Sequence, residues 1–362
     1  MKKAILGLVA VVALGGALVA CGPTTQDPSN PGPGPEVEKT IEVLVQTADH
    51  GWTGAVQSYA KEKVDAINAA GKYKVNLTAC ENATLENQKI DDLLTAKDSL
   101  HGIVMLPIDN TVESGITKIV DAGVPFVQFD RIVSTSKIDN AANRVANVLG
   151  DNYGIGKATG ERFIAKGLER GDRILIMPGD NSSVPVSRNN GFYDALKAAG
   201  WTDEELATID STDYTQWSRT TASNLFESKG DAILDYEWIF THDSEIAMGV
   251  LESLNSNRVS NEVKAHFKNG GIKALAASSG LDEMYAVLEG QHKTDYGALL
   301  SADCDLFDVT YDPAMIQTAI QDLIDHLEGK SVEKNHVIPV SVVDKANVGE
   351  FRGFGRSDTY RK

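Results

Sequence analysis

The sequence predicts an α/β protein built from two doubly wound parallel sheets. From residue 40 onward, short apolar segments alternate with amphipathic segments of helical length, and the cycle begins again near residue 151. The strand candidates, such as residues 102–106 and 173–177, are apolar at nearly every position. This pattern is typical of parallel strands that helices cover on both faces. The length of 362 residues agrees, since it is enough for about two domains.

The first series begins with a strand at residues 41–46 and a helix at residues 53–70, which Gly71 ends. Further strands are expected at 73–78, 102–106, 124–129 and 144–149, with helices at 84–97 and 112–121. Ligands bind at the carboxyl ends of the strands in open parallel sheets. The residues that directly follow these strands are therefore the candidates for a binding site.

The second series repeats the alternation. Strands are expected at 173–177, 206–210, 235–241, 272–277 and 297–301, and helices at 153–168, 187–199, 218–227, 244–254, 281–288 and 313–327. Because each series makes its own sheet, the chain is expected to fold into two lobes of similar design.

Composition excludes several classes of protein. The chain carries 51 acidic residues against 34 basic ones, a formal net charge of -17, which repels phosphate backbones and argues against nucleic-acid binding. Hydrophobic residues make up 42%, so wholesale disorder is excluded as well. Three cysteines are too few for a disulfide scaffold, and we expect Cys80 and Cys304 to be unpaired.

The N-terminus has the layout of an export signal. Two lysines precede a long apolar stretch, which ends in small residues and the sequence Leu18-Val19-Ala20-Cys21. This ending resembles the bacterial lipobox, so residues 1–20 are interpreted as a lipoprotein signal peptide and Cys21 as the acylated first residue of the mature chain. An uncleaved anchor is the alternative.

Residues 22–40 are rich in proline and glycine and are expected to form a spacer. The predicted location is the cell envelope, with the lipid at Cys21 in a membrane and the folded body facing the periplasm or the exterior.

Catalytic and cofactor motifs are missing. The segment GIGKATG at residues 154–160 has Ala158 where a phosphate loop needs Ser or Thr, and it misses the dinucleotide fingerprint by one position. Small residues that allow close packing between a helix and a strand explain it better. No G-x-S-x-G, H-E-x-x-H or paired C-x-x-C motif occurs. We therefore expect no enzyme activity, no cofactor and no metal.

Charged and aromatic side chains cluster after the predicted strands. They are Asp49, His50, Trp52, Asp130, Arg131, Arg188, Trp217, His242 and Asp243. Each alone fits turn or capping chemistry. The two adjacent acid–imidazole pairs, Asp49-His50 and His242-Asp243, would together also suit a metal ion. Carboxylates and guanidinium groups match the hydroxyls of a sugar, and aromatic rings pack on its C–H face. The combination favours a carbohydrate ligand.

Several segments also resemble a known family, in this order along the chain: QTADHGW, GIVMLPIDN, AGVPFVQFDRI, NVLGDNYGIGKATGE, THDSEIAMGVLESL and HVIPVSVVDKANVGEF. They are similar to the periplasmic monosaccharide-binding proteins of the ribose and galactose/glucose type. The resemblance implies a type I periplasmic binding protein fold, with two lobes joined by three hinge crossovers that close around a sugar. It also implies a monomer that delivers the sugar to an ABC transporter permease.

The resemblance places the lobe boundaries and the site. It implies an N-terminal lobe of residues 41–150 plus 303–332 and a C-terminal lobe of residues 151–302 plus 333–362. The implied ligand residues are Asp49, His50, Trp52, Asp130, Arg131, Arg188, Trp217, His242, Ser279, Ser301 and Asp303, with Tyr214 as an alternative to Trp217. Trp52 would stack on the sugar ring.

Departures from the family pattern leave the sugar open. His242 stands where the family usually has Asn, and Ser279 where it commonly has Asp. The loop at 179–187 lacks the His and Asp of the galactose branch, and residues 166–173 leave no room for its calcium loop. The ligand is expected to be a hexose, a pentose or another polyol, without structural calcium.

Other functions of this fold are weighed against transport. A protein that presents its sugar to a chemoreceptor or sensor kinase would have the same sequence features. A transcriptional regulator would need a basic DNA-binding headpiece where the export signal stands, and a dehydrogenase would need an intact dinucleotide fingerprint.

Overall fold

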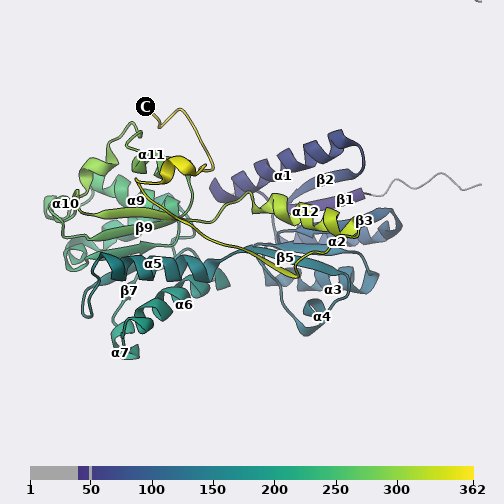
Figure 1. Cartoon of the computed structure of the whole chain (residues 1–362), viewed down its shortest axis with the longest axis horizontal. Coiled ribbons are helices and arrows are strands. Elements are labelled where there is room, and N and C mark those ends of the chain that lie inside the picture. Colours follow the sequence, from purple (N-terminus) through teal and green to yellow (C-terminus); the bar gives the residue numbers. More distant parts are fainter. Residues whose placement is uncertain (1–39, 49–50) are drawn as a thin grey trace, which may run out of the picture. The chain divides into compact units, whose positions relative to one another are not determined.

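The computed structural model of the protein describes residues 40–48 and 51–362 (Figure 1). The predicted signal peptide, Cys21, residues 22–39 of the proline-rich spacer, Asp49 and His50 lie outside the described residues. All described residues belong to one compact unit of the chain.

The N-terminal lobe contains a six-stranded parallel sheet in the order β11-β5-β4-β3-β1-β2. Its strands are β1 (Thr40–Gln46), β2 (Lys74–Cys80), β3 (Leu100–Met105), β4 (Phe126–Phe129), β5 (Arg144–Gly150) and β11 (Asn335–Ile338). Its helices are α1 (Gly51–Ala70), α2 (Ala83–Thr95), α3 (Glu113–Ala122), α4 (Ser136–Asp139) and α12 (Met315–Leu327), with short 3₁₀ turns η1 (Lys97–Ser99) and η2 (Asn110–Val112).

Strand β1 shows why these strands are apolar throughout. Side chains alternate between the faces of a strand, and both faces of β1 are buried. Val43 and Val45 join the core beneath α1 and α12, whereas Leu44 joins the core beneath α2 and α3. In agreement, α1 packs against α12 and α2 packs against α3 (Figure 1).

The C-terminal lobe contains a second six-stranded sheet in the order β12-β10-β9-β8-β6-β7, parallel except for the pairing of β12. Its strands are β6 (Ile174–Met177), β7 (Asp210–Ser211), β8 (Trp238–Thr241), β9 (Ala274–Ser279), β10 (Asp305–Thr310) and β12 (Val342–Val343). Its helices are α5 (Asn152–Lys166), α6 (Ser183–Ala198), α7 (Asp203–Leu206), α8 (Arg219–Ser228), α9 (Ser244–Asn255), α10 (Asn261–Lys268) and α11 (Asp282–Leu288), with 3₁₀ turns η3 (Gly230–Asp235), η4 (Tyr296–Leu299) and η5 (Val348–Glu350).

These two sheets confirm the predicted class of two doubly wound lobes. Within the described residues the chain passes between the sheets three times, after β5, after β10 and after β11. The last two crossings fall later than the expected boundaries at 303 and 333. Strand β10 pairs with β9 in the C-terminal sheet, and β11 pairs with β5 in the N-terminal sheet.

The strand expected at residues 297–301 is wrong. Residues Tyr296–Leu299 form the turn η4, and the strand is β10, which begins at Asp305. Two aspartates, Asp305 and Asp308, interrupt the apolar pattern of the true strand. The apolar residues 298–300, by contrast, have the composition of a buried strand. The strand expected at 206–210 is also shorter, because only Asp210–Ser211 pairs with β6.

The glycines of GIGKATG allow two helices to pack closely. A Cβ atom added at Gly156 would lie 1.7 Å from the carbonyl oxygen of Arg188 on α6, and one added at Gly191 would lie 2.0 Å from that of Tyr153 on α5. The interpretation as a packing motif is confirmed, with a neighbouring helix as the partner instead of a strand. This contact fixes the backbone of Arg188 against α5.

Both described cysteines are free thiols. Burial raises the pKa of Cys80 to about 11 and that of Cys304 to about 12, so neither is a reactive thiolate at neutral pH. Among the described helices, none has the length and apolar character needed to cross a membrane. The described residues contain no group of three or more side chains placed to hold a metal ion.

Candidate ligand-binding site

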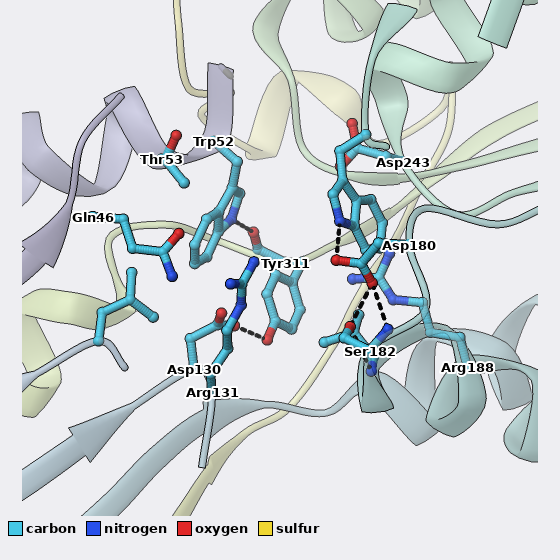
Figure 2. A pocket seen from close by; sticks show the side chains of 13 residues that line it. Gln46, Trp52, Thr53, Asp130, Arg131, Asp180, Ser182, Arg188, Asp243 and Tyr311 are labelled. Atoms are coloured by element: carbon cyan, nitrogen blue, oxygen red, sulfur yellow. Dashed lines mark hydrogen bonds between the residues drawn. The ribbon is translucent and has the colours of Figure 1, made fainter. Parts of the chain in front are cut away.

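A pocket whose empty space, open solvent included, is about 480 Å³ lies where strands of both sheets end. The N-terminal lobe contributes Gln46, Trp52, Thr53, Leu106, Asp130 and Arg131, and the C-terminal lobe contributes Asp180, Ser182, Val184, Arg188, Trp217 and Asp243. Tyr311, on the crossover after β10, completes the lining. Figure 2 shows Tyr311 between Trp52 on one side and Asp180 and Arg188 on the other.

Trp52 is the second residue of α1, six residues after the end of β1. Its ring is stacked on Phe129 with 6.1 Å between centroids, and its indole nitrogen donates to the carbonyl oxygen of Tyr311 at 2.9 Å. The side chain is thus held on one face by the core and at its polar edge by the crossover. Only 7% of the residue is exposed. A ring fixed in this way is a rigid platform for a ligand.

Asp130 and Arg131 follow β4 directly. Asp130 has a φ of +62°, a region that non-glycine residues seldom occupy, and its backbone nitrogen donates to the Val148 carbonyl oxygen at 2.8 Å. Its carboxylate accepts a hydrogen bond from the Tyr311 hydroxyl. Arg131 donates to the carbonyl oxygen of Ile108, at the end of the neighbouring strand β3. The strained backbone of Asp130 fits a ligand site, because such conformations are often found there.

Tyr311 connects three parts of the molecule. Its hydroxyl donates to Asp130 of the N-terminal lobe and accepts from the Asn152 amide of α5 at 3.2 Å. A Cβ atom at Gly150 would lie 2.2 Å from its ring, so the ring packs directly on the first crossover. Burial and the nearby Asp130 carboxylate raise the pKa of Tyr311 well above its usual value. The phenol therefore stays protonated and acts as a donor.

Arg188 is 2% exposed and lies on α6. Its Nε atom donates to the Asn152 side-chain oxygen at 3.0 Å, and its Nη1 atom donates to the His242 carbonyl oxygen and to the Ser278 hydroxyl, the latter at 3.1 Å. These acceptors are all neutral. Burial lowers the pKa of Arg188 from its ordinary value, and the surrounding acidic groups oppose this shift.

Trp217 is held by Asp180. The indole nitrogen donates to the Asp180 carboxylate at 2.8 Å, and Ser182 donates to the same carboxylate through its backbone nitrogen at 2.9 Å. Trp217 and Gln216 both have positive φ angles, near +56° and +55°. A Cβ atom at Gly179 would lie 2.2 Å from the indole, so this glycine is needed for the ring to reach the pocket.

Asp243 caps α9 by accepting from the backbone nitrogen of Glu245 at 2.8 Å. It lines the pocket and is 8% exposed. Burial raises the pKa of this carboxyl to about 7. At neutral pH the group is therefore present partly as the acid.

The structure brings together six of the residues that were expected after the strands, namely Trp52, Asp130, Arg131, Arg188, Trp217 and Asp243. Tyr214, the alternative to Trp217, is 47% exposed and lines a separate groove.

Two expected ligand residues lie behind the pocket wall. His242 is fully buried, with Nε2 3.0 Å from the Asn189 side-chain oxygen, and burial lowers the pKa of its imidazole well below the usual value. Ser279 is 1% exposed, and its hydroxyl donates to that of Ser244 at 3.1 Å. Neither side chain lines the pocket. Both support the wall that Arg188 and Asp243 form.

Ser301 and Asp303 are not in the pocket. They line a different cavity, together with Arg162 and Lys166. The error follows from the misplaced last strand. The true strand ends at Thr310, so the residue that enters the pocket from the second crossover is Tyr311.

Sequence reasoning missed several lining residues: Gln46, Thr53, Leu106, Asp180, Ser182, Val184 and Tyr311. Gln46 is the last residue of β1, and Leu106 directly follows β3, so the strand-end rule applied consistently would have found both. Asp180 and Ser182 belong to the loop between β6 and α6, where they look like ordinary capping residues.

The pocket combines two indole rings, three carboxyl groups and two guanidinium groups. Carboxylates accept and guanidinium groups donate hydrogen bonds, so this set matches a molecule with many hydroxyls better than an apolar one. Two parallel-sheet lobes, three crossovers and a shared pocket define a type I periplasmic binding protein.

Comparison with protein families gives the same class. The family model described as a periplasmic binding protein domain matches residues 41–291, and the chain belongs to this family. Its members bind solutes and do not catalyse reactions, which confirms the prediction that the protein is not an enzyme.

The chain is similar along most of its length to transport proteins. It is 22% identical to the fructose import binding protein of Bifidobacterium longum, with 96% of each chain covered. It is 24% identical to the ribose import binding protein of Bacillus subtilis, over 71% of this chain and 78% of the other. The structure of an ABC transporter solute-binding protein from Agrobacterium vitis with bound D-fucose matches with a TM-score of 0.64 and 19% identity, over 85% and 96% of the two chains.

Proposed function

We propose that the protein binds a monosaccharide outside the cytoplasm and delivers it to the permease of an ABC transporter. The observation that carries this proposal is the composition of the pocket. Indole rings from both lobes, Trp52 and Trp217, line it together with the carboxylate of Asp130 and the guanidinium of Arg188. The relatives that import ribose and fructose support a sugar as the solute.

Binding would work by hinge closure. A ligand that touches Trp52 and Asp130 of one lobe and Arg188 and Trp217 of the other gains all its contacts only when the lobes are together. It therefore favours the closed form by its differential affinity. The residues that absorb the movement would be those of the crossovers, where Tyr311 is anchored. The permease would recognise the closed form.

A lipid on Cys21 would keep the protein at the membrane. The lipobox and the spacer at residues 22–40 support this proposal. Each buried methylene contributes about 0.8 kcal/mol, so a single acyl chain binds a membrane only marginally. Stable attachment therefore takes more than one acyl chain. In cells grown with labelled palmitate, the protein should carry label and sediment with membranes. A Cys21→Ala variant that still carries label would contradict the assignment.

Thermal unfolding with a panel of monosaccharides, polyols, nucleosides and amino acids tests the function. A ligand at one hundred times its Kd adds about 2.7 kcal/mol to the free energy of unfolding, a shift that is easily measured. We expect one or a few monosaccharides to stabilise the protein, and Asp130→Ala to abolish the effect.

Asp303→Ala is the matched control, because this carboxylate lies in the other cavity. A full response of the folded Asp130→Ala variant would refute the proposed site. Stabilisation by amino acids or nucleosides instead of sugars would refute the proposed ligand class.

A further inference from the structure

Asp308 is a buried carboxyl group that does not reach the pocket. It lies in the middle of β10, is fully buried, and accepts hydrogen bonds from the Ser244 hydroxyl and from the backbone nitrogen of Gly280, the latter at 3.0 Å. Within the described part of the chain, no cationic side chain forms a salt bridge with it or with Asp243. A buried carboxylate without a cation is costly unless it holds a proton.

Asp308 and Asp243 belong to one hydrogen-bonded cluster. Ser244 follows Asp243 in the chain, and its hydroxyl donates to Asp308. The Ser279 hydroxyl donates to Ser244 at 3.1 Å and lies beside the Asp243 carboxyl group. A single layer of serine hydroxyls therefore separates the carboxyl group at the pocket from the one inside the sheet.

The charges around the cluster do not balance if both carboxyls ionise. Arg188 on α6 is the nearby buried cation, and its Nε and Nη1 atoms donate to neutral acceptors. His242 beside it is neutral at physiological pH, since burial lowers its pKa. The guanidinium of Arg188 thus faces three carboxyl groups, those of Asp130, Asp243 and Asp308. Burial raises the pKa of both Asp243 and Asp308 to about 7, and the charge of Asp243 further raises that of Asp308.

Other titratable groups around the cluster do not supply the missing charge. Glu245, on the same helix as Asp243, is acidic and is paired with Arg219 at 2.6 Å. Tyr285 on α11 faces Asp308, and burial raises the pKa of its phenol, so it stays neutral. The cluster is therefore expected to retain a proton near neutral pH.

We propose that Asp308 is a positioning residue that keeps a proton on Asp243, so that Asp243 meets the ligand as a hydrogen-bond donor. The inference rests on the proposed function and adds to it the protonation state of the site. The ligand would offer Asp243 a hydroxyl or ring oxygen as acceptor, as a neutral sugar does. Because the bound ligand excludes the remaining water from Asp243, binding is coupled to the uptake of a proton.

Calorimetry of the full protein with the sugar found in the thermal panel tests this coupling. Titrations at pH 6, 7 and 8 in phosphate and in Tris give the number of protons taken up from the difference in heat between the buffers. We expect uptake to approach one proton per sugar at pH 8. The affinity should fall as the pH rises through 7, by up to tenfold per pH unit.

Two variants separate this role from a structural one. Asp243→Asn always presents a donor, so it should bind with pH-independent affinity and without proton uptake. Asp308→Asn removes the neighbouring negative charge, so the midpoint of the pH profile should move down by about one unit. Asp312→Asn, which changes an exposed carboxyl on the crossover outside the pocket, should leave the midpoint in place.

Equal heats of binding in phosphate and in Tris, with an affinity that does not change between pH 6 and 8, would overturn the inference. The proposed function would still stand. An Asp308→Asn variant that binds with an unchanged midpoint would overturn the role of Asp308. If no sugar binds the wild-type protein, the proposed function fails first, and the inference fails with it.

Discussion

The indole nitrogen of Trp52 donates a hydrogen bond to the backbone carbonyl oxygen of Tyr311 at 2.9 Å. Trp52 belongs to α1 of the N-terminal lobe, whereas Tyr311 directly follows β10 of the C-terminal sheet. The centroids of their aromatic rings also lie 5.6 Å apart. An aromatic side chain of the pocket is therefore bonded to the backbone of a crossover, so the ligand platform and the hinge are mechanically connected.

Trp52→Phe should weaken ligand binding while the protein remains folded. Phenylalanine keeps an aromatic face but cannot donate to the Tyr311 carbonyl oxygen, and a lost hydrogen bond costs about 1 kcal/mol. We expect a several-fold higher Kd in calorimetric titration with the sugar. Trp201→Phe is the control, because this buried indole lies outside the pocket. Equal affinities of the two variants would show that the bond to Tyr311 is unimportant for binding.

Tyr311→Phe should lower the free energy of unfolding by about 1–3 kcal/mol, because two polar groups each lose the hydrogen bond that they make to this buried hydroxyl. The hydroxyl bonds to Asp130 and Asn152, both beside the pocket. Tyr153→Phe removes a similar bond to Asp194 from an exposed tyrosine and should cost at most about 0.5 kcal/mol. Urea denaturation compares the two variants. Equal losses would contradict the importance assigned to the Tyr311 hydroxyl.

Gly156→Ala should destabilise the protein by about 3 kcal/mol and weaken binding. The added Cβ would lie 1.7 Å from the Arg188 carbonyl oxygen, so α5 and α6 must move apart and carry Arg188 with them. Gly349→Ala adds the same group where no atom lies within 4 Å. The midpoint of urea unfolding and the Kd for sugar measure the two effects. A Gly156→Ala variant as stable as Gly349→Ala would show that the helices tolerate the extra group.

Glu86→Gln should flatten the pH dependence of stability. Glu86 is 1% exposed, and burial raises the pKa of its carboxyl to about 7. Because this folded pKa lies above the unfolded value near 4.3, the folded state holds the proton more tightly. Stability is therefore lost as the pH rises from about 4.5 through 7.

Glutamine retains an acceptor for the backbone nitrogen of Ile108, to which Glu86 is bonded at 3.0 Å, and it carries no ionisable proton. Between pH 5 and 8, the variant should gain stability relative to the wild type by an amount on the order of 3 kcal/mol. Glu113→Gln, at an exposed position on α3, should follow the wild-type curve. Parallel curves for wild type and Glu86→Gln would refute the assigned protonation.

Most of the fold followed from the sequence because buried parallel strands are apolar on both faces. The same rule located Trp52, Asp130 and Arg131, since each comes at or just after the end of such a strand. It failed at β10, where Asp305 is paired with Arg162 and Asp308 is buried inside the sheet. Strand periodicity does not reveal charges that tertiary contacts neutralise.

The roles of individual site residues depended on contacts between distant parts of the chain. His242 looked like a ligand residue, but its ring is turned toward Phe240 and Asn189. Asp180 looked like a capping residue, yet it also holds Trp217 across 37 residues of sequence. Such pairings are fixed by packing and cannot be derived from local spacing.

A crystal structure of the protein grown with the saturating sugar from the thermal panel tests the central claim most directly. The account predicts electron density for one monosaccharide against the indoles of Trp52 and Trp217, with its hydroxyls within hydrogen-bond distance of Asp130 and Arg188. A sugar bound elsewhere, or a pocket filled only by water at saturating concentration, would contradict it.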